Sequence, residues 1–284
     1  MPRSVTEATT AGLAALAGMQ TRAGYFPFYV GSQETSWRRC DPIFATAYIM
    51  MIVGRLLPAE RIAHATDYIA NSRRSDGLWH YDPSLDIPPD ADTTACALAA
   101  LARDGRTSET AGGADLLRTF WRAEAGPFRT WRIDGPWSHA GRDDPVVNCH
   151  ILHALQLLGA PATDIERSAV AALVQRSLSG SRYYSSPGAI ALACRRGRIG
   201  EEFWPPIVVA PPKGGLGLLQ WFTATGRHRD QLVPLLLRTQ REDGSWPVAP
   251  WVTGVNVPSW GGPAISTALA IEALLVRGGA AKPG

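Results

Sequence analysis

Two aspartates and two threonines at the start of an Ala- and Leu-rich segment are the side chains best placed for chemistry. They follow a pair of prolines and comprise Asp90, Asp92, Thr93 and Thr94. We expect Asp92 or Thr93 to cap the helix that begins here, because a side-chain oxygen accepts from the free N–H groups of a first turn. A cap needs only one acid, and two carboxyl groups one residue apart can also handle a proton as a pair.

The composition is that of a folded protein without the charge of a nucleic-acid binder. Of the 284 residues, 45% are hydrophobic and 19% are charged, which is enough apolar material for a large core. The net charge of +3 comes without a long basic block, which argues against a nucleic-acid surface. The longest apolar run, residues 45–54, is too short to span a membrane, and the N-terminal pattern is a poor match to a signal peptide. We therefore expect a soluble, cytoplasmic protein.

The cysteines are spread along the chain, at Cys40, Cys96, Cys149 and Cys194. This spacing differs from the Cys-x-x-Cys pairs of zinc knuckles and from the dense pattern of disulfide frameworks. We expect reduced, buried cysteines and no metal centre.

An internal repeat with a period of about fifty residues governs the expected fold. Each copy carries a Gln or Arg, a glycine four residues later and then an aromatic residue. Amphipathic segments precede these turns and more apolar segments follow them, so the repeating unit is a helix hairpin. The repeat glycines lie 53, 49, 54 and 64 positions apart, at Gly24, Gly77, Gly126, Gly180 and Gly244.

Six hairpins account for the whole chain. The apolar segments predict inner helices at 41–56, 92–103, 144–158, 187–196, 214–226 and 262–277. The amphipathic segments predict outer helices at 5–19, 59–71, 114–122, 164–178 and 229–240, with a short one at 200–204. Only residues 207–210 are typical of a strand. Because the inner helices must bury nearly their full circumference, we predict an all-α (α/α)6 toroid that forms a single domain, residues 1–284.

The N-termini of the inner helices share one end of such a toroid, and the site is expected there. His150 and His153 lie on one face of the third inner helix. They are either satisfied polar groups of the lumen, or a base or hydrogen-bond donor for the acid pair. Aromatic side chains are expected to line the cavity, although Trp79 also fits a packing role in its repeat turn. The lining candidates are Trp79, Tyr81, Trp131, Trp137, Tyr183, Tyr184, Trp204, Trp251 and Trp260.

Two of these patterns resemble motifs of one family. Gln240-x-x-x-Gly244-x-Trp246 resembles the QW motif of squalene-hopene cyclases and related terpene synthase β domains. The stretch from Asp90 to Ala95 resembles the acid motif of class II terpene cyclases, D-x-D-D-T-A. The repeat, the expected toroid and the acid motif together cover almost the whole chain.

The resemblance implies roles for the acid pair. Asp92 matches the acid that protonates a terminal alkene or epoxide in the family, and Asp90 matches the first acid of the motif. Thr93 replaces the third acid, and this D-x-D-T-T form is similar to that of drimane-forming sesquiterpene cyclases. The implied reaction converts farnesyl diphosphate into a drimane-type bicyclic diphosphate. Family members usually pair the toroid with a second helical domain, so here either the lumen forms the site alone, or a second copy or partner domain closes its mouth.

The implied chemistry requires a carboxylic acid that keeps its proton near neutral pH, whereas an unperturbed aspartic acid titrates at about 3.9. Burial and a neighbouring carboxylate favour the protonated form, while a helix N-terminus opposes it. We expect Asp92 to depend on desolvation and on sharing a proton with Asp90, with Thr93 or Thr94 orienting its carboxyl group. The lining aromatic rings are expected to stabilise the carbocation.

The implied reaction requires no cofactor, although Mg²⁺ can assist the binding of a diphosphate. Candidate diphosphate contacts are Lys213, Arg195 and Arg196, and Glu201 with Glu202 is a candidate Mg²⁺ site. Each of these groups is also compatible with a plain surface charge.

Other functions compete with a cyclase. The prolines before Asp90 are incompatible with the central strand of a haloacid-dehalogenase-type phosphatase. A protein prenyltransferase needs a zinc site, and the Asp-x-Cys pattern expected for it is missing from the sequence. A glycosidase remains open, with Asp90 or Asp92 paired to Asp144 or Glu202. The main rival is a toroid that binds an isoprenoid or another lipid, or acts as a scaffold, without catalysis.

Overall fold

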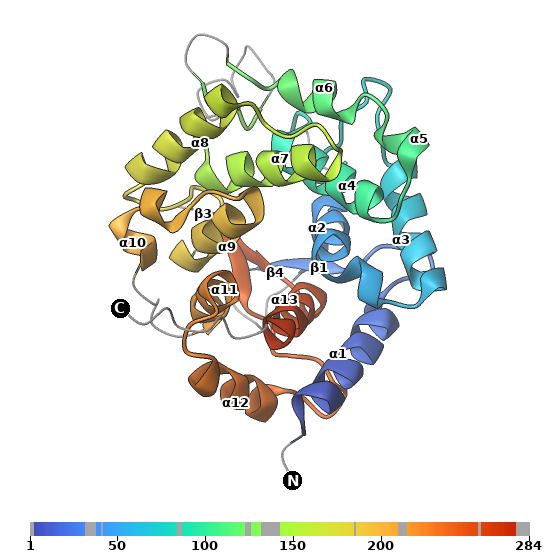
Figure 1. The fold of residues 1–284 in the computed structure, drawn as a ribbon. Helices are drawn as coiled ribbons and strands as arrows, with labels where there is room; N and C mark the ends of the chain where they lie inside the picture. The colour runs from blue at the N-terminus through green and yellow to red at the C-terminus, as the bar shows by residue number, and fades with distance from the viewer. Residues whose placement is uncertain are drawn as a thin grey trace.

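Helices form two concentric rings in this protein (Figure 1). The computed structural model describes residues 3–31, 38–40, 42–83, 87–122, 126–131, 143–184, 186–209, 215–254 and 257–276. The predicted α/α toroid is thus confirmed, with a small sheet added to it. Within these ranges, none of the helices is both long and apolar enough to cross a membrane.

The inner ring consists of apolar helices that are buried almost all round. In α4, every side chain from Ala91 to Leu101 is buried. Two of the helices approach so closely that a Cβ atom on Gly188 of α9 would lie 2.1 Å from the carbonyl oxygen of Gly217 in α11. The inner helices are α2 (Ile43–Val53), α4 (Ala91–Arg103), α7 (Pro145–Leu157), α9 (Pro187–Gly197), α11 (Gly215–Thr225) and α13 (Pro263–Leu275).

The outer ring consists of amphipathic helices that bury one face each. In α3, for example, only Ala65, Thr66 and Ile69 are buried. The outer helices are α1 (Val5–Met19), α3 (Ala59–Asn71), α5 (Thr107–Thr110), α6 (Gly113–Arg118), α8 (Asp164–Arg176), α10 (Pro206–Val209) and α12 (Arg229–Thr239), with short 3₁₀ turns at Gly54–Leu56 and Glu201–Phe203. The outer helix predicted at 114–122 ends earlier, at Arg118, and the short α5 precedes it.

The ring closes on itself because each inner helix packs against the next. The contacts run from α2 through α4, α7, α9, α11 and α13, and α13 returns to α2. Helix α1 packs against α13, and Arg3 Nη1 donates a hydrogen bond to Gln240 Oε1 at 3.0 Å. Residues from the two ends of the chain therefore lie side by side.

The repeat glycines form the turns that lead from an outer helix to an inner one. Gly24 and Gly244 have φ values of 95° and 88°, a left-handed region that favours glycine. In the two repeats that have a Gln, its side chain closes the turn: Gln20 Nε2 donates to the Gly24 carbonyl and Gln240 Nε2 to the Gly244 carbonyl, both at 2.9 Å. The motif thus encodes a backbone turn and its hydrogen bond.

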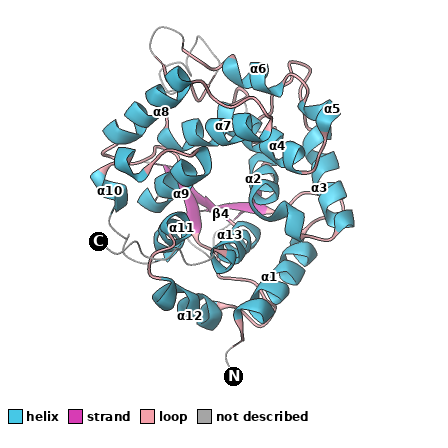
Figure 2. Cartoon of the chain, in the orientation of Figure 1, coloured by secondary structure: helices cyan, strands magenta, loops and turns pink. Residues whose placement is uncertain are grey.

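A four-stranded sheet at one end of the ring was not predicted. Its strands are β1 (Phe28–Gly31), β2 (Arg38–Cys40), β3 (Pro250–Gly254) and β4 (Val257–Gly261), in the order β2-β1-β4-β3, and all pairs are antiparallel. The two hairpins precede α2 and α13, which are neighbours in the closed ring, so β1 can pair with β4 (Figure 2). This pairing depends on ring closure. The strand predicted at 207–210 is wrong, because residues 206–209 form α10.

The turn geometry predicts unequal costs for two glycine substitutions. Gly180 has a φ of 92° and open space around its Cα, whereas a Cβ on Gly244 would lie 2.4 Å from the Ala11 carbonyl oxygen. Gly180→Ala should lower the free energy of unfolding by about 1–2 kcal/mol through backbone strain alone. Gly244→Ala should lower it clearly more, because α1 must also move. Urea unfolding of both variants tests this, and equal losses would contradict it.

Candidate active site

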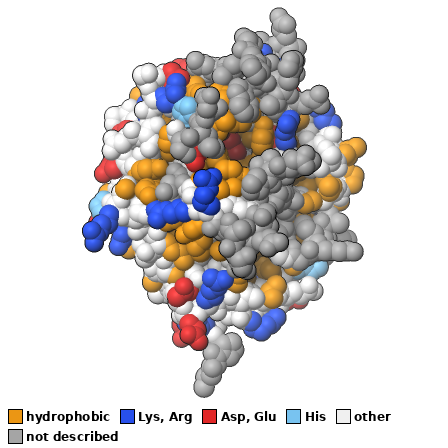
Figure 3. Space-filling model, turned by 180° about the vertical axis from the view of Figure 1, so that it is seen from behind, with side chains coloured by type: hydrophobic (Ala, Val, Ile, Leu, Met, Phe, Trp, Pro, Cys, Tyr) orange, Lys and Arg blue, Asp and Glu red, His pale blue; other side chains and the backbone are white. Residues whose placement is uncertain are grey.

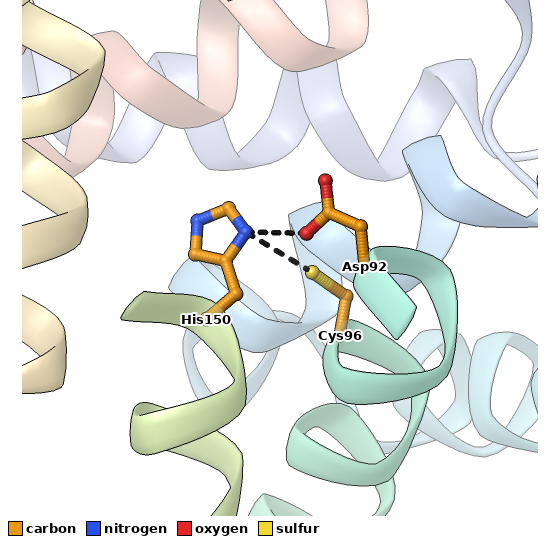
Figure 4. A group of neighbouring side chains, drawn as sticks. All are labelled: Asp92, Cys96 and His150. Atoms are coloured by element: carbon orange, nitrogen blue, oxygen red, sulfur yellow. Dashed lines mark hydrogen bonds and ion pairs between the residues drawn. The ribbon is translucent and has the colours of Figure 1, made fainter. Parts of the chain in front are cut away.

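The Asp92 carboxyl group lies at the centre of a buried polar cluster at the N-terminal end of the inner ring. It stands in the first turn of α4, and its side chain is 11% exposed. His150 of α7 places Nδ1 2.7 Å from Asp92 Oδ1 (Figure 4). The Tyr184 hydroxyl, in the segment before α9, donates to Asp92 Oδ2 at 2.5 Å. Groups from three successive repeats therefore meet at one carboxyl group.

Asp90, rather than Asp92 or Thr93, caps helix α4. Its Oδ1 accepts from the Thr93 backbone N–H at 2.7 Å. Burial raises the pKa of Asp90 to about 7, the N–H of Thr93 opposes this shift and the nearby Asp92 adds to it. Asp90 is thus the capping residue of α4, and the Asp92 carboxyl group is free to bond to groups outside its own helix.

The expectation that Thr93 or Thr94 orients the Asp92 carboxyl group is wrong. Thr93 contributes its backbone N–H to Asp90, and the Thr94 hydroxyl accepts from the Trp79 backbone N–H at 3.3 Å. His150 and Tyr184 orient Asp92 instead. The sequence analysis named His150 as a possible base or hydrogen-bond donor for the acid pair, and the structure places its ring beside Asp92.

Aromatic rings surround the polar cluster on the side of the sheet. Trp251 of β3 is at their centre, with its ring stacked on Phe44 at a centroid distance of 5.3 Å. The same ring lies 4.5 Å from that of Tyr48 and 5.4 Å from that of Tyr184, which holds the acid. Figure 3 shows the face opposite to that of Figure 1, where hydrophobic side chains surround a hollow with acidic side chains visible in it.

Some predicted lining residues join this aromatic wall. Tyr81 packs on Phe44 at 5.7 Å and edge-on against Trp260 at 5.5 Å. Trp131 pairs through its backbone with Asp90 and donates from Nε1 to the Tyr183 hydroxyl at 3.0 Å. Tyr81, Trp131 and Trp260 thus lie close to the acid pair or its aromatic surroundings.

Two other residues predicted to line the cavity, Trp79 and Trp204, donate their indole N–H groups to backbone carbonyls of the repeat framework. The Trp79 indole N–H donates to the Ile69 carbonyl at 2.7 Å, at the end of the preceding outer helix. Trp246 makes the equivalent bond to the Leu236 carbonyl at 2.9 Å, so this contact belongs to the repeat turn. Trp204 donates to the Ile199 carbonyl next to the 3₁₀ turn at Glu201–Phe203. Trp137 and Lys213 lie outside the described residues.

The cations suggested for a diphosphate are engaged elsewhere. Arg195 donates to the carbonyl groups of Thr223 and Ala224 in α11. Arg196 forms a two-pronged ion pair with Glu272, at 2.6 and 2.7 Å, and donates to the Tyr48 hydroxyl at 2.7 Å. One of the two carboxylates suggested as Mg²⁺ ligands is also engaged, because Glu201 forms an ion pair with Arg227 at 2.8 Å.

The Arg196–Glu272 pair, near the C-terminal ends of α9 and α13, was missed by the sequence analysis, as were Phe44 and Tyr48. Tyr48 joins the two ends of the lumen, since its hydroxyl accepts from Arg196 while its ring lies edge-on to His150 at 5.6 Å. The sequence offers little to identify such residues. Phe44 and Tyr48 stand inside the almost wholly apolar helix α2, and the partners of Tyr48 and Arg196 come from other repeats.

Several solved structures match nearly the whole chain, although neither a protein-family model nor a curated protein sequence does. The apo structure of the type II terpene cyclase MstE from Scytonema is 16% identical, has a TM-score of 0.67 and covers 95% of this chain and 96% of that chain. An MstE variant in complex with its substrate geranylgeranyl dihydroxybenzoate has a TM-score of 0.67 at 17% identity, with the same coverage. A protein from Actinoplanes has a TM-score of 0.66 at 15% identity, covering 95% and 98%. This chain therefore has the fold of these proteins.

The buried His153 predicts how stability changes with pH. Burial, and then the charges of Arg196 and Arg103, lower its pKa to about 3, whereas an unfolded histidine titrates at about 6.5. Between these values only the unfolded chain takes up the proton, so this residue makes stability fall as the pH drops, by up to about 1.4 kcal/mol per pH unit.

His153→Gln should therefore lose less stability than the wild type between about pH 7 and about pH 4 in urea unfolding. His64→Gln, at an exposed histidine of α3, is the matched control and should follow the wild type. Parallel curves for the wild type and His153→Gln would contradict the prediction.

Proposed function

We propose that this protein is a class II terpene cyclase, in which Asp92 protonates the terminal double bond of a linear isoprenoid. The observation that carries the proposal is the Asp92 carboxyl group held between His150 and Tyr184 and bordered by aromatic rings. The fold shared with type II terpene cyclases supports it.

The polar cluster suits a strong, oriented acid. His150 and Tyr184 occupy one position on each Asp92 oxygen, and a carboxyl oxygen keeps a further lone pair that can carry the proton. When the O–H bond breaks and the C–H bond forms, the same two groups stabilise the carboxylate that is left. Asp90, whose pKa is raised to about 7 by burial, is readily protonated and then adds no second negative charge beside Asp92.

The aromatic wall suits the product of that proton transfer. Protonation leaves a tertiary carbocation, which the next double bond of the chain attacks to close a ring. Ring faces attract a cation by about 0.5 to 2 kcal/mol each, and Trp251, Phe44 and Tyr48 lie next to the acid cluster. Apolar walls also keep water from quenching the cation.

Farnesyl diphosphate, giving a drimane-type diphosphate, is the substrate that we propose from the D-x-D-T-T form of the acid motif. Two of the cations that the sequence suggested for binding the diphosphate, Arg195 and Arg196, are hydrogen-bonded or ion-paired to groups of the protein. MstE acts on geranylgeranyl dihydroxybenzoate, an isoprenoid without a diphosphate. A test of function must therefore offer both kinds of head group.

The direct test is to incubate the purified protein with farnesyl diphosphate, geranylgeranyl diphosphate and geranylgeranyl dihydroxybenzoate, with and without Mg²⁺. Products are analysed by GC-MS, after dephosphorylation of the diphosphates. We expect a cyclic product whose formation falls by at least about 10²-fold in Asp92→Asn, because the amide cannot supply the proton.

Asp144→Asn is the matched control. Asp144 caps α7 as Asp90 caps α4 and is also buried, and its oxygens accept from Val146, Ser181 and Arg182 rather than from groups that touch Asp92. Because Ser181 also accepts from the Tyr184 backbone N–H, this variant should lose some activity, but far less than Asp92→Asn, if circular dichroism shows that it is folded. A product formed equally by Asp92→Asn would overturn the role of Asp92, and tight binding without any product would favour the non-catalytic isoprenoid-binding toroid.

A further inference from the structure

Cys96 adds a sulfur atom to the acid cluster. It stands one helical turn after Asp92 on α4, and four residues along a helix place both side chains on one face. Its Sγ lies 3.9 Å from His150 Nδ1, the same nitrogen that lies 2.7 Å from Asp92 Oδ1 (Figure 4). A thiol, an imidazole nitrogen and a carboxylate oxygen thus lie within 4.8 Å of one another.

We propose that Asp92, Cys96 and His150 form a binding site for a soft divalent cation such as Zn²⁺ or Co²⁺, and that this cation blocks the acid. The sequence did not indicate it, because the third ligand comes from another helix and the Asp-x-x-x-Cys spacing is not that of a known zinc motif. The two helices that supply the ligands, α4 and α7, are neighbours in the inner ring.

The distances fit a tetrahedral ion after small adjustments. With zinc bonds of about 2.3 Å to sulfur and about 2.0–2.2 Å to nitrogen and oxygen, the sulfur and nitrogen ligands lie about 3.6 Å apart and the nitrogen and oxygen ligands about 3.3 Å apart. The corresponding pairs here lie at 3.9 and 2.7 Å. The sulfur and oxygen atoms lie within 4.8 Å of each other, against about 3.6 Å around one zinc ion, so side-chain rotations that move the ligand atoms by up to about 1 Å bring the three onto one ion.

The charges balance when the ion binds. Cys96 gives up its thiol proton to solvent and binds as a thiolate, Asp92 binds as a carboxylate, and His150 binds through an unprotonated Nδ1 with its proton on Nε2. The two negative ligands neutralise the two positive charges of the ion. A neutral complex suits a buried location, where an unpaired charge is costly.

The ligand set also determines which ion binds and how binding affects the acid. Thiolate and imidazole ligands favour Zn²⁺ and Co²⁺ and are poor ligands for Mg²⁺. Asp92 is the most exposed of the three, with 11% of its side chain exposed against 1% for His150, so an ion would reach the site from the side of Asp92. The ion binds Asp92 as a carboxylate and so keeps it from carrying the proton, which should inhibit cyclisation; this consequence, unlike the binding, rests on the proposed function.

Cobalt absorption tests the binding independently of any activity. We would titrate the chelator-treated protein with Co²⁺ and record the visible bands of tetrahedral cobalt and the near-ultraviolet sulfur-to-cobalt band. We expect both in the wild type, bleached by stoichiometric Zn²⁺ and unaffected by Mg²⁺. Even loss of a hydrogen-bond partner of a metal ligand typically costs about 10–100-fold in affinity, so Cys96→Ala should weaken binding by at least that factor and abolish the sulfur band.

Cys194→Ala is the matched control. Cys194 is buried on the inner helix α9, and its Sγ lies 3.8 Å from that of Cys149, so this thiol pair is the competing location for a soft ion. The control should keep the cobalt bands. No bands in the wild type, bands that persist in Cys96→Ala, or bands lost only in Cys194→Ala would each overturn the proposal. Cys96→Ser replaces Cys96→Ala if the alanine variant does not fold.

In the cyclase assay, Zn²⁺ should inhibit the wild type, whereas whatever activity Cys96→Ala has without metal should not fall when Zn²⁺ is added. Cobalt bands without cyclisation would leave the site standing and refute the proposed function. Cyclisation without cobalt bands would support the proposed function and refute the metal site.

Discussion

A carboxyl group buried at the mouth of a helical barrel needs hydrogen-bond partners, because an isolated buried carboxylate is too costly to form. Asp92 finds them in His150 and Tyr184, which belong to the next two repeats. Their meeting depends on the inner ring, whose helices all begin at this end. The repeat turns, the glycines and the Gln side chains that close them serve to hold that ring in place.

The lumen changes character along its length. At the mouth lie the acid cluster and the aromatic rings around Trp251, supplied partly by a sheet that exists because the first and last repeats are neighbours. Tyr48 connects this region to the half-buried Arg196–Glu272 pair near the helix C-termini. This pair links α9 to α13 across the ring at the end away from the acid cluster.

The same concentration of groups has a second chemical consequence. An oxygen that can carry a proton can also bind a metal ion, and Cys96 lies close enough to turn an Asp–His pair into a three-ligand set. The Asp92 carboxyl group can then hold either a proton or a metal ion, but not both. A cyclase of this kind would work only where such ions are scarce or bound elsewhere.

By itself, the sequence determined the repeat, the alternation of amphipathic and apolar helices and therefore the toroid, because burial periodicity and turn glycines are local properties. It also singled out Asp90, Asp92 and His150. Only the tertiary structure decided that Asp90 is the cap, that Tyr184 holds Asp92, and that the Trp79 indole N–H bonds to the preceding outer helix. The sheet and the sulfur beside His150 likewise depend on which repeats touch. Contacts between repeats are set by ring closure, and no local pattern records them.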